Sequence, residues 1–365
     1  MSSDPVLTVD PWLQILWERN GSDLLLTTGS APRIRVDGRL EPIPGESILT
    51  GERIHDITMP LLSAGQLLIF EEQQDVDFSF SWGDRARIRG SAFTQRGQTA
   101  LALRMIPAKI PSFADLGLPY AAEWVCDKPR GFVLVTGPTG SGKSTSLASI
   151  IDRINDKRAA HILTIEDPVE YVHHHKTSAV NQREVGLDSP SFDRALRSAL
   201  REDPDVMLIG EMRDIDSIQI ALTMAETGHL VFATLHTNDA PQAIDRIIDV
   251  FPAWRQEQTR VQLAASLCAV IAQRLVPRKG GGMVAAFEVL IATNPVRNLI
   301  REGRSNQLLN VMFTGTKEGM ITMENSLAQL IIDGVIDYDE AMNITARPKE
   351  LIRTLEQMDK SFVKV

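Results

Sequence analysis

Residues 137–144 read Gly-Pro-Thr-Gly-Ser-Gly-Lys-Ser and directly follow the run Phe-Val-Leu-Val-Thr at 132–136. This is the pattern G-x-x-x-x-G-K-[S/T] of a phosphate-binding loop, in its usual place between a buried strand and a helix. The glycines let the backbone curl so that N–H groups converge on phosphate oxygens, and the N-terminus of the next helix adds partial positive charge. The segment therefore predicts an α/β domain that binds a nucleotide.

The side chains of this loop indicate which nucleotide chemistry to expect. The ammonium group of Lys143 should reach the β- and γ-phosphates of ATP, and the Ser144 hydroxyl should hold the Mg²⁺ ion that bridges them. We therefore predict ATP and Mg²⁺ as cofactors and hydrolysis of ATP as the reaction. The predicted binding residues are Gly137, Pro138, Thr139, Gly140, Ser141, Gly142, Lys143, Ser144 and Thr145.

The pattern around the loop predicts the domain that carries it. From Arg130 onward, apolar strand-like runs alternate with helical stretches, which is typical of a parallel sheet covered by helices on both faces. Beyond about residue 290 the strand-like runs fade and helical stretches follow. The predicted strands are 132–136, 161–165, 206–209 and 230–235.

The N-terminal part of the chain has a different pattern. Short runs bounded by Gly, Pro and Asp, several of them alternating apolar with polar residues, predict an antiparallel sheet with a helical stretch at 51–72. We expect a small α+β domain at 1–107, a proline-rich linker region at 108–130 and the ATPase domain at 131–365. The predicted strands of the first domain are 24–28, 33–36, 76–80, 88–95 and 100–106.

Composition narrows the class of protein. Over 365 residues, 43% are apolar and 23% are charged, which is ordinary for a soluble globular protein. The net charge of −9 disfavours a nucleic-acid-binding protein, so we expect no nucleic-acid partner. Cys126 and Cys268 are far apart in the sequence, which argues against a disulfide framework or a four-cysteine zinc site. No signal peptide or membrane-spanning helix is expected from the apolar pattern.

Acidic residues follow two of the predicted strands. Ligands of open parallel sheets bind at the carboxyl ends of the strands, so these acids are candidates for the site. Glu211, after the strand at 206–209, is predicted to orient or deprotonate the attacking water. Glu166 and Asp167 are predicted to contact the metal or the water, although Asp167-Pro168 is also a turn signal.

Two histidines flank the strand at 230–235. His236 follows it, and is predicted to sense the γ-phosphate or to polarise a neighbouring group. His229 precedes it and is a second catalytic candidate. A histidine that merely packs in the core is the alternative for both positions.

Four segments of the chain occur in the order 137–145, 164–170, 210–214 and 228–236. They resemble the Walker A, Asp box, Walker B and His box motifs of the secretion ATPase superfamily. More narrowly, the chain resembles the PilT-type retraction ATPases of bacterial type IV pili. The segments that carry this second resemblance are 21–24, 181–186, 235–238 and 295–302.

The resemblance implies a RecA-like P-loop ATPase domain with a smaller PAS-like domain before it, and a ring of six identical subunits. It implies docking on the inner-membrane platform protein of the pilus, indirect action on pilin, and a place at the cytoplasmic face of the inner membrane. Leu25, Glu202 and Asp239 depart from the family's usual His, Gln and Ser or Ala. None of these departures removes a predicted catalytic group, so we expect pilus retraction and twitching motility as the function.

Arginines are candidates for closing the γ-phosphate charge, either in their own subunit or from a neighbour. Those considered are Arg96, Arg104, Arg194 and Arg201. A late helical stretch at 296–301, with Arg297 and Arg301, either packs on the core or couples nucleotide state to retraction. Other functions left open are a pilus-assembly or type II secretion ATPase, a catalytically weak accessory retraction subunit and, least favoured, a nucleic-acid translocase.

Overall fold

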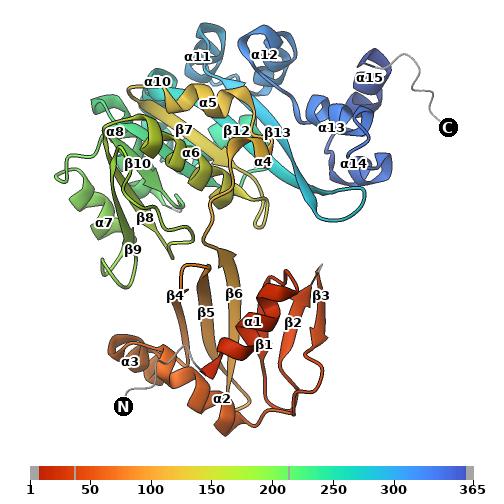
Figure 1. Cartoon of the computed structure of the whole chain (residues 1–365). Coiled ribbons are helices and arrows are strands. Elements are labelled where there is room, and N and C mark those ends of the chain that lie inside the picture. The colour runs from red at the N-terminus through yellow and green to blue at the C-terminus, as the bar shows by residue number, and fades with distance from the viewer. Residues whose placement is uncertain (1–7, 37, 213, 359–365) are drawn as a thin grey trace. The chain divides into compact units, whose positions relative to one another are not determined.

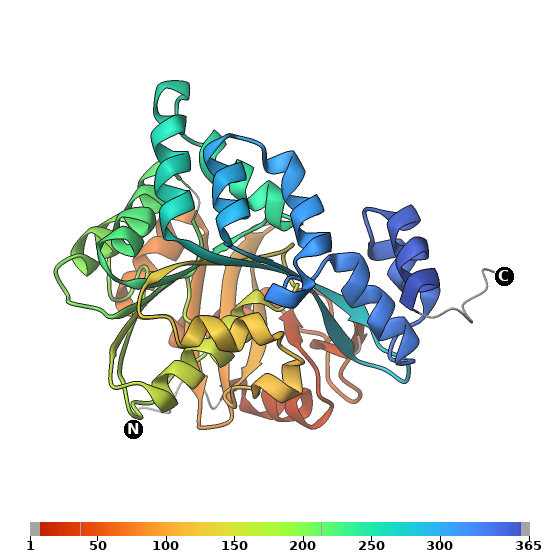
Figure 2. The same cartoon turned by 90° about the horizontal axis from the view of Figure 1, so that it is seen from above.

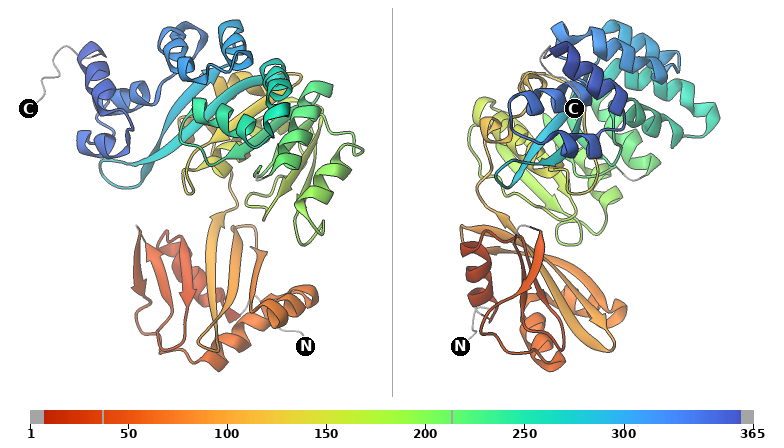
Figure 3. Two further views of the ribbon diagram at one scale, coloured as in Figure 1. Left: turned by 180° about the vertical axis from the view of Figure 1, so that it is seen from behind. Right: turned by 90° about the vertical axis from the view of Figure 1, so that its right-hand side faces the viewer.

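The computed structural model describes residues 8–36, 38–212 and 214–358. Over these residues the chain divides into two compact units, each with its own hydrophobic core. Figure 3 shows the sheets and helices of each unit from two further sides. Within the described residues, none of the helices has the combination of length and hydropathy that a membrane span requires.

The N-terminal unit comprises Met1–Lys109 together with Pro168–Val172. Its antiparallel sheet has the strand order β3-β2-β1-β6-β5-β4 (Figure 1), as the alternating pattern predicts. Its helices and strands are α1 (Asp10–Glu18), β1 (Asp23–Leu26), β2 (Arg33–Val36), β3 (Arg39–Pro42), α2 (Gly51–Thr58), α3 (Ala64–Gln73), β4 (Asp75–Trp82), β5 (Ala86–Gln95) and β6 (Gln98–Pro107).

The helix predicted at 51–72 is two helices. α2 ends at Thr58, a short 3₁₀ turn carries Pro60, and Ser63 starts α3. Ser63 and Gln66 form a capping box, in which each side chain accepts a hydrogen bond from the other residue's backbone N–H. This local hydrogen bonding restarts the helix where the apolar pattern alone runs on.

The second unit comprises Ile110–Asp167 and His173–Val365 and is built on one sheet with the order β13-β12-β7-β11-β10-β8-β9. Its strands are β7 (Gly131–Thr136), β8 (His161–Glu166), β9 (Ala179–Glu184), β10 (Val206–Ile209), β11 (Leu230–Leu235), β12 (Leu267–Pro277) and β13 (Met283–Ile291). All neighbours pair in parallel except β12 and β13, which are antiparallel. Every residue of β7, β10 and β11 is buried, because helices cover both faces of the sheet (Figure 2).

The four strands predicted for this unit are present, and β9, β12 and β13 are additional. β12 starts at Leu267 directly after a helix that ends at Ser266, so no turn signal separates the two apolar patterns. The helices are α4 (Phe113–Leu116), α5 (Tyr120–Cys126), α6 (Lys143–Lys157), α7 (Phe192–Ala199), α8 (Ile215–Thr227), α9 (Ala240–Asp249), α10 (Ala253–Ser266), α11 (Asn294–Arg301), α12 (Leu308–Thr314), α13 (Met323–Ile332), α14 (Tyr338–Ile344) and α15 (Pro348–Met358).

The stretch 108–130 is not a simple linker. It contains α4 and α5, and α5 buries Ala121, Val125 and Cys126 in the core of the second unit. Pro119 is the N-cap of α5 rather than a break in the structure. The interpretation of this whole stretch as a linker region therefore has to be corrected for the part that packs as helix.

The last three helices form a smaller core of their own. Side chains of α13, α14 and α15 pack with Val276 of β12 and Ala286 of β13. We call residues 323–358 the C-terminal helical module. It lies beside the β12–β13 hairpin (Figure 1).

Candidate nucleotide-binding site

The phosphate loop joins β7 to α6, and its glycines are required by its shape. Gly137, Gly140 and Gly142 have φ values of +144°, +77° and +86°, which L side chains rarely adopt. A Cβ at Gly137 would lie 2.3 Å from the Gln273 carbonyl oxygen, and one at Gly142 would lie 2.8 Å from Gln273 Nε2. Both the backbone conformation and the close approach of β12 therefore exclude side chains at Gly137 and Gly142.

Lys143 is the first residue of α6 and is buried. Its ammonium group donates hydrogen bonds to the carbonyl oxygens of Gly137 at 2.7 Å and Pro138 at 3.0 Å. The helix has Gly142 as its N-cap and no side-chain cap, so backbone N–H groups of its first turn are available to an anion. Positive charge and backbone donors thus converge at one place.

Hydroxyl groups around the loop also fit an anionic ligand. Among the residues the structure describes, Thr136 Oγ1, Ser141 Oγ and Thr237 Oγ1 are buried without a hydrogen-bond partner. Thr136 and Leu235 are paired at the ends of β7 and β11, and Thr237 follows shortly after. A buried hydroxyl without a partner costs free energy, and phosphate oxygens would supply the missing acceptors. The residues present therefore fit the phosphates of a nucleoside triphosphate.

Gln273 supports the loop from below, and the sequence analysis missed it. Its side chain is buried, and its Oε1 accepts a hydrogen bond of 2.7 Å from Ser146 Oγ on α6. Because Gln273 also packs against Gly137 and Gly142, it contacts both ends of the loop. The sequence offered one sign of this role, because Gln273 is a polar amide within the mostly apolar stretch 267–276.

Glu166 lies at the end of β8, next to the end of β10. Its Oε1 accepts hydrogen bonds from Thr164 Oγ1 at 2.6 Å and Gln182 Nε2 at 3.3 Å. A Cβ at Gly210 would lie only 3.3 Å from the Glu166 Cα. This packing explains the glycine where the Walker B motif usually has an aspartate, and it brings Glu166 close to Glu211 along the edge of the sheet.

Glu211 and His236 meet across β10 and β11. His236 Nε2 lies 3.0 Å from Glu211 Oε1, and the side chains are 46% and 27% exposed respectively, so both remain accessible to a substrate. The Thr234 hydroxyl donates to the Gly210 carbonyl, and Met212 N–H donates to Thr234 O at 3.3 Å. These bonds hold the segment after β10 against β11.

His229 does not belong to this arrangement in its own subunit. It precedes β11, whose parallel pairing with β7 sets Leu230 opposite Gly131 and Leu235 opposite Thr136. The length of β11, at about 3.3 Å per residue, therefore puts His229 about 20 Å from the phosphate loop. Its Nδ1 lies 2.9 Å from the Met224 carbonyl oxygen. A catalytic role for His229 in the nucleotide site of its own subunit, as predicted from the sequence, is therefore wrong.

The candidate arginines lie at four separate places. Arg194 is exposed on α7 and Arg201 is exposed shortly after it. Arg96 is in the turn between β5 and β6, and Arg104 on β6 is held by Asp23 Oδ1 at 2.8 Å. That one of these arginines stabilises the negative charge on the γ-phosphate stays a prediction. Asp167 is exposed just after β8, and its role in holding the metal also stays a prediction.

Arg297 has a packing role in α11. Its guanidinium donates to the carbonyl oxygens of Ala264, Ala265 and Leu267 at the end of α10. Donors at a helix C-terminus satisfy carbonyl groups that have no partner within the helix. The contacts favour the packing interpretation of this helix over direct coupling through Arg297.

Comparison with known proteins decides the family. The profile described as "Type II/IV secretion system protein" matches residues 74–343. The chain belongs to this family. It is 47% identical over 324 residues to the "Type IV pilus retractation ATPase PilT" of Pseudomonas aeruginosa, covering 89% of this chain and 94% of that protein. It is 41% identical over 331 residues to the "Type IV pilus ATPase PilU" of the same organism, covering 90% and 86%.

A solved structure agrees with these sequence matches. The crystal structure of the pilus retraction motor PilT with bound ADP matches with a TM-score of 0.87 and 46% identity, over 94% of this chain and 98% of that one. The resemblance inferred from the motifs is confirmed, and so is the α/β ATPase fold with a smaller N-terminal domain. The chain is a nucleotide-binding ATPase of the secretion family.

Proposed function

We propose that this chain is a homohexameric motor that hydrolyses ATP to retract type IV pili. One observation carries the enzymatic part: the phosphate loop with Lys143, the Glu166 carboxylate and the Glu211–His236 pair lie at the ends of adjacent strands of one sheet. The similarity to proteins named as pilus retraction ATPases over nearly the whole chain supports the rest.

The residues divide the chemistry as follows. Backbone N–H groups of the loop and the Lys143 ammonium bind the β- and γ-phosphates, and Ser144 with Glu166 and Asp167 would hold Mg²⁺, which offsets phosphate charge when bound. Glu211 orients the attacking water and accepts its proton. His236 holds the Glu211 carboxylate in place through the contact of 3.0 Å.

A ring would complete each site with an arginine from the neighbouring subunit. Arg194 and Arg201 are exposed, as a residue that acts across a subunit boundary must be. Arg96 and Arg104 are the corresponding candidates from the N-terminal unit. We place the motor at the cytoplasmic face of the inner membrane, where it docks on the pilus platform protein and acts on pilin through it. A domain boundary near residues 107–110 would let nucleotide binding change the arrangement of the two domains.

The test combines chemistry with a cellular measurement. Purified protein should release phosphate from ATP in the presence of Mg²⁺, and Glu211→Gln should lower turnover by about 10²–10⁴-fold while ATP still binds. Glu356→Gln, an exposed acid on α15, is the matched control and should behave as the parent. A strain without the gene should carry long, unretracted pili and should lose twitching motility.

The alternatives give other outcomes in the same experiments. A strain without any pili would indicate an assembly ATPase, and a secretion defect with normal pili would indicate a type II secretion ATPase. Normal binding of ATP with negligible phosphate release from the parent protein would indicate an accessory subunit. Each of these results would contradict the retraction motor.

A further inference from the structure

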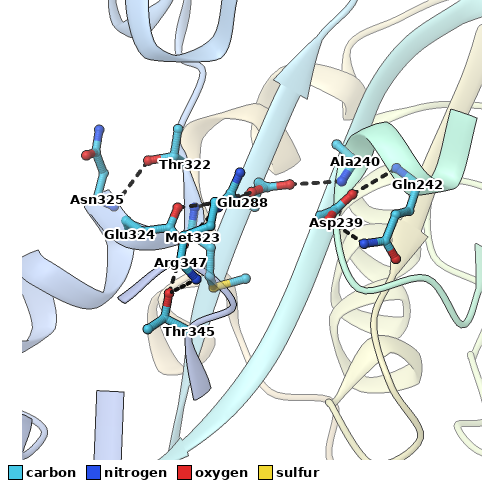
Figure 4. Close-up of polar contacts among 10 residues, drawn as sticks. All are labelled: Asp239, Ala240, Gln242, Glu288, Thr322, Met323, Glu324, Asn325, Thr345 and Arg347. Atoms are coloured by element: carbon cyan, nitrogen blue, oxygen red, sulfur yellow. Dashed lines mark hydrogen bonds and ion pairs between the residues drawn. The ribbon is translucent and has the colours of Figure 1, made fainter. Parts of the chain in front are cut away.

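Glu288 on β13 is fully buried, yet its carboxylate has partners on two sides (Figure 4). Oε1 accepts a hydrogen bond of 2.8 Å from the backbone N–H of Ala240. Oε2 accepts one of 2.9 Å from Arg347 Nη2. A buried carboxylate is costly unless it is paired and hydrogen-bonded, so both contacts stabilise the arrangement.

The first side of Glu288 leads to the nucleotide site. Residues 236–239 connect β11 to α9, and His236 at the start of this loop contacts Glu211. Asp239 caps α9 by accepting from Gln242 N at 2.8 Å and from Gln242 Nε2 at 2.6 Å. Ala240 is the next residue, so the bond to Glu288 fixes the end of the loop that carries His236 (Figure 4).

The second side leads to the C-terminal helical module. Arg347 Nε lies 3.1 Å from Glu324 Oε1, and Arg347 Nη2 lies 3.1 Å from Glu324 Oε2. Thr345 Oγ1 also donates to Glu324 Oε1, at 2.9 Å. Met323 N–H, at the start of α13, lies 3.4 Å from Glu288 Oε2. The module is therefore attached to the sheet through a buried ionic cluster as well as through its apolar core.

The ionic cluster of Glu288, Glu324 and Arg347 should oppose movement of its members relative to one another. Two buried carboxylates, of Glu288 and Glu324, share one arginine. Burial raises the pKa of Glu288. Burial also opposes the charge of Arg347, but the carboxylates of Glu324 and Glu288 outweigh it and raise the pKa of that guanidinium. Separating either partner would leave a buried group unsatisfied, which is costly, and more so when the group is charged. The loop and the module are thus held to one relative position.

We infer that Glu288 is a positioning residue that couples the His236 loop to the C-terminal helical module. A displacement of the module moves α9 and the loop with it, and so changes how His236 meets Glu211. The module would then be the part through which a bound partner changes the rate of hydrolysis. This inference rests on the proposed ATPase function for its effect on rate, and on geometry alone for the coupling.

Arg347→Gln tests the coupling from the side remote from the site. We expect kcat for ATP to fall about fivefold, within the range that coupling through packed networks carries. KM for ATP should stay within about twofold, because the phosphate loop is untouched. Hydrogen exchange at the backbone amides of Ala240 and Gln242 should become faster. In a double-mutant cycle with Glu288→Gln, the effects on kcat should not add, since both changes act through one cluster.

Lys279→Gln is the matched control. It breaks the exposed ion pair of 3.2 Å between Lys279 Nζ and Asp337 Oδ1, at the edge of the same module. It should change neither kcat nor exchange at the amides of Ala240 and Gln242. If Arg347→Gln does not fold, Arg347→Lys and Thr345→Ala carry the test, with smaller changes expected in the same direction.

The inference would be overturned by a folded Arg347→Gln protein with parental kcat and parental exchange at the amides of Ala240 and Gln242. It would also be overturned by strictly additive effects in the cycle. A parent protein without ATPase activity would instead refute the proposed function. In that case the exchange measurement would still decide whether Glu288 transmits a change from the module to the loop.

Discussion

His236 Nε2 lies 3.0 Å from Glu211 Oε1, across the ends of β10 and β11. Each residue is the first or second after its strand, so strand direction and pairing bring them together. The Thr234–Gly210 hydrogen bond keeps the two strand ends in this register. The contact gives a carboxylate at the site a partner that fixes its orientation.

Glu211→Gln should lower kcat for ATP hydrolysis by about 10²–10⁴-fold, the usual contribution of a general base. The amide keeps the size and the hydrogen bond but cannot accept a proton. His236→Gln should lower kcat by less, because the glutamate remains. Phosphate release and binding of a fluorescent ATP analogue would be measured in parallel. Unchanged turnover in Glu211→Gln would exclude this residue as the base.

Lys143→Ala should weaken ATP binding by about 10–100-fold, because a hydrogen bond to a charged group contributes about 1.5–3 kcal/mol. Turnover should fall with it. Lys157→Ala, at the exposed far end of the same helix, is the control for loss of one positive charge. Equal binding of ATP by the Lys143 variant and its parent would refute the phosphate-loop assignment.

Gly142→Ala should lower both stability and turnover. The backbone has φ of +86°, which costs an L side chain about 1–2 kcal/mol. The new Cβ would also lie 2.8 Å from Gln273 Nε2. Gly280→Ala has the same φ of +86° with open space around it, so it should lose similar backbone stability but keep its kcat. Thermal unfolding and phosphate release would separate the two; equal losses of kcat would contradict the role of Gln273 packing.

His173 should make the protein sensitive to mild acid. Burial lowers its pKa from 6.5 to about 4, with Asp152 opposing this shift and Lys176 and His174 adding to it. The unfolded chain takes up the proton first, so stability from this group is lost as pH falls from 6.5 towards about 4. The loss should reach about 2 kcal/mol at pH 5.

The measurement is the free energy of unfolding at pH 7 and pH 5 for the parent and for His173→Gln. The variant should lose less stability between the two pH values than the parent does. His174→Gln changes an exposed neighbour that makes the smallest contribution to the lowered pKa of His173, so its pH dependence should stay close to that of the parent. Parallel pH dependence of the parent and His173→Gln would show that this histidine does not titrate as described.

If the arginine of one subunit completes the site of its neighbour, two inactive variants should complement each other in a mixed ring. Lys143→Ala subunits retain the arginine, and subunits with that arginine changed to Ala retain the phosphate loop. A mixed ring contains complete sites, so the mixture should regain ATPase activity. Arg96, Arg104, Arg194 and Arg201 would be tested in turn. No recovery with any inactive arginine variant would indicate that the arginine acts within its own subunit.

The phosphate loop and the main strands were predictable because their causes are local. The pattern G-x-x-x-x-G-K-[S/T] directly after an apolar run indicates a phosphate-binding loop between a strand and a helix. The apolar runs at 206–209 and 230–235 match β10 and β11 to the residue. The family followed from motifs of the same local kind. β12 was missed because its apolar run continues directly from α10 without a turn.

The placement of His229 shows where local reasoning stops. Its motif suggests chemistry, but a residue at the start of a parallel strand lies at the opposite edge of the sheet from one at its end. The linker region shows the same limit, since prolines that suggest an irregular chain instead precede α5.

The sequence by itself determined the nucleotide-binding loop, the strands around it and the family, because each depends on residues close together in the chain. Only the tertiary structure decided that Gln273 supports the loop, that His236 meets Glu211, and that Glu288 joins α9 to Arg347. These contacts depend on which strands become neighbours. Strand order arises from burial of the whole sheet between its helices, which no short segment specifies.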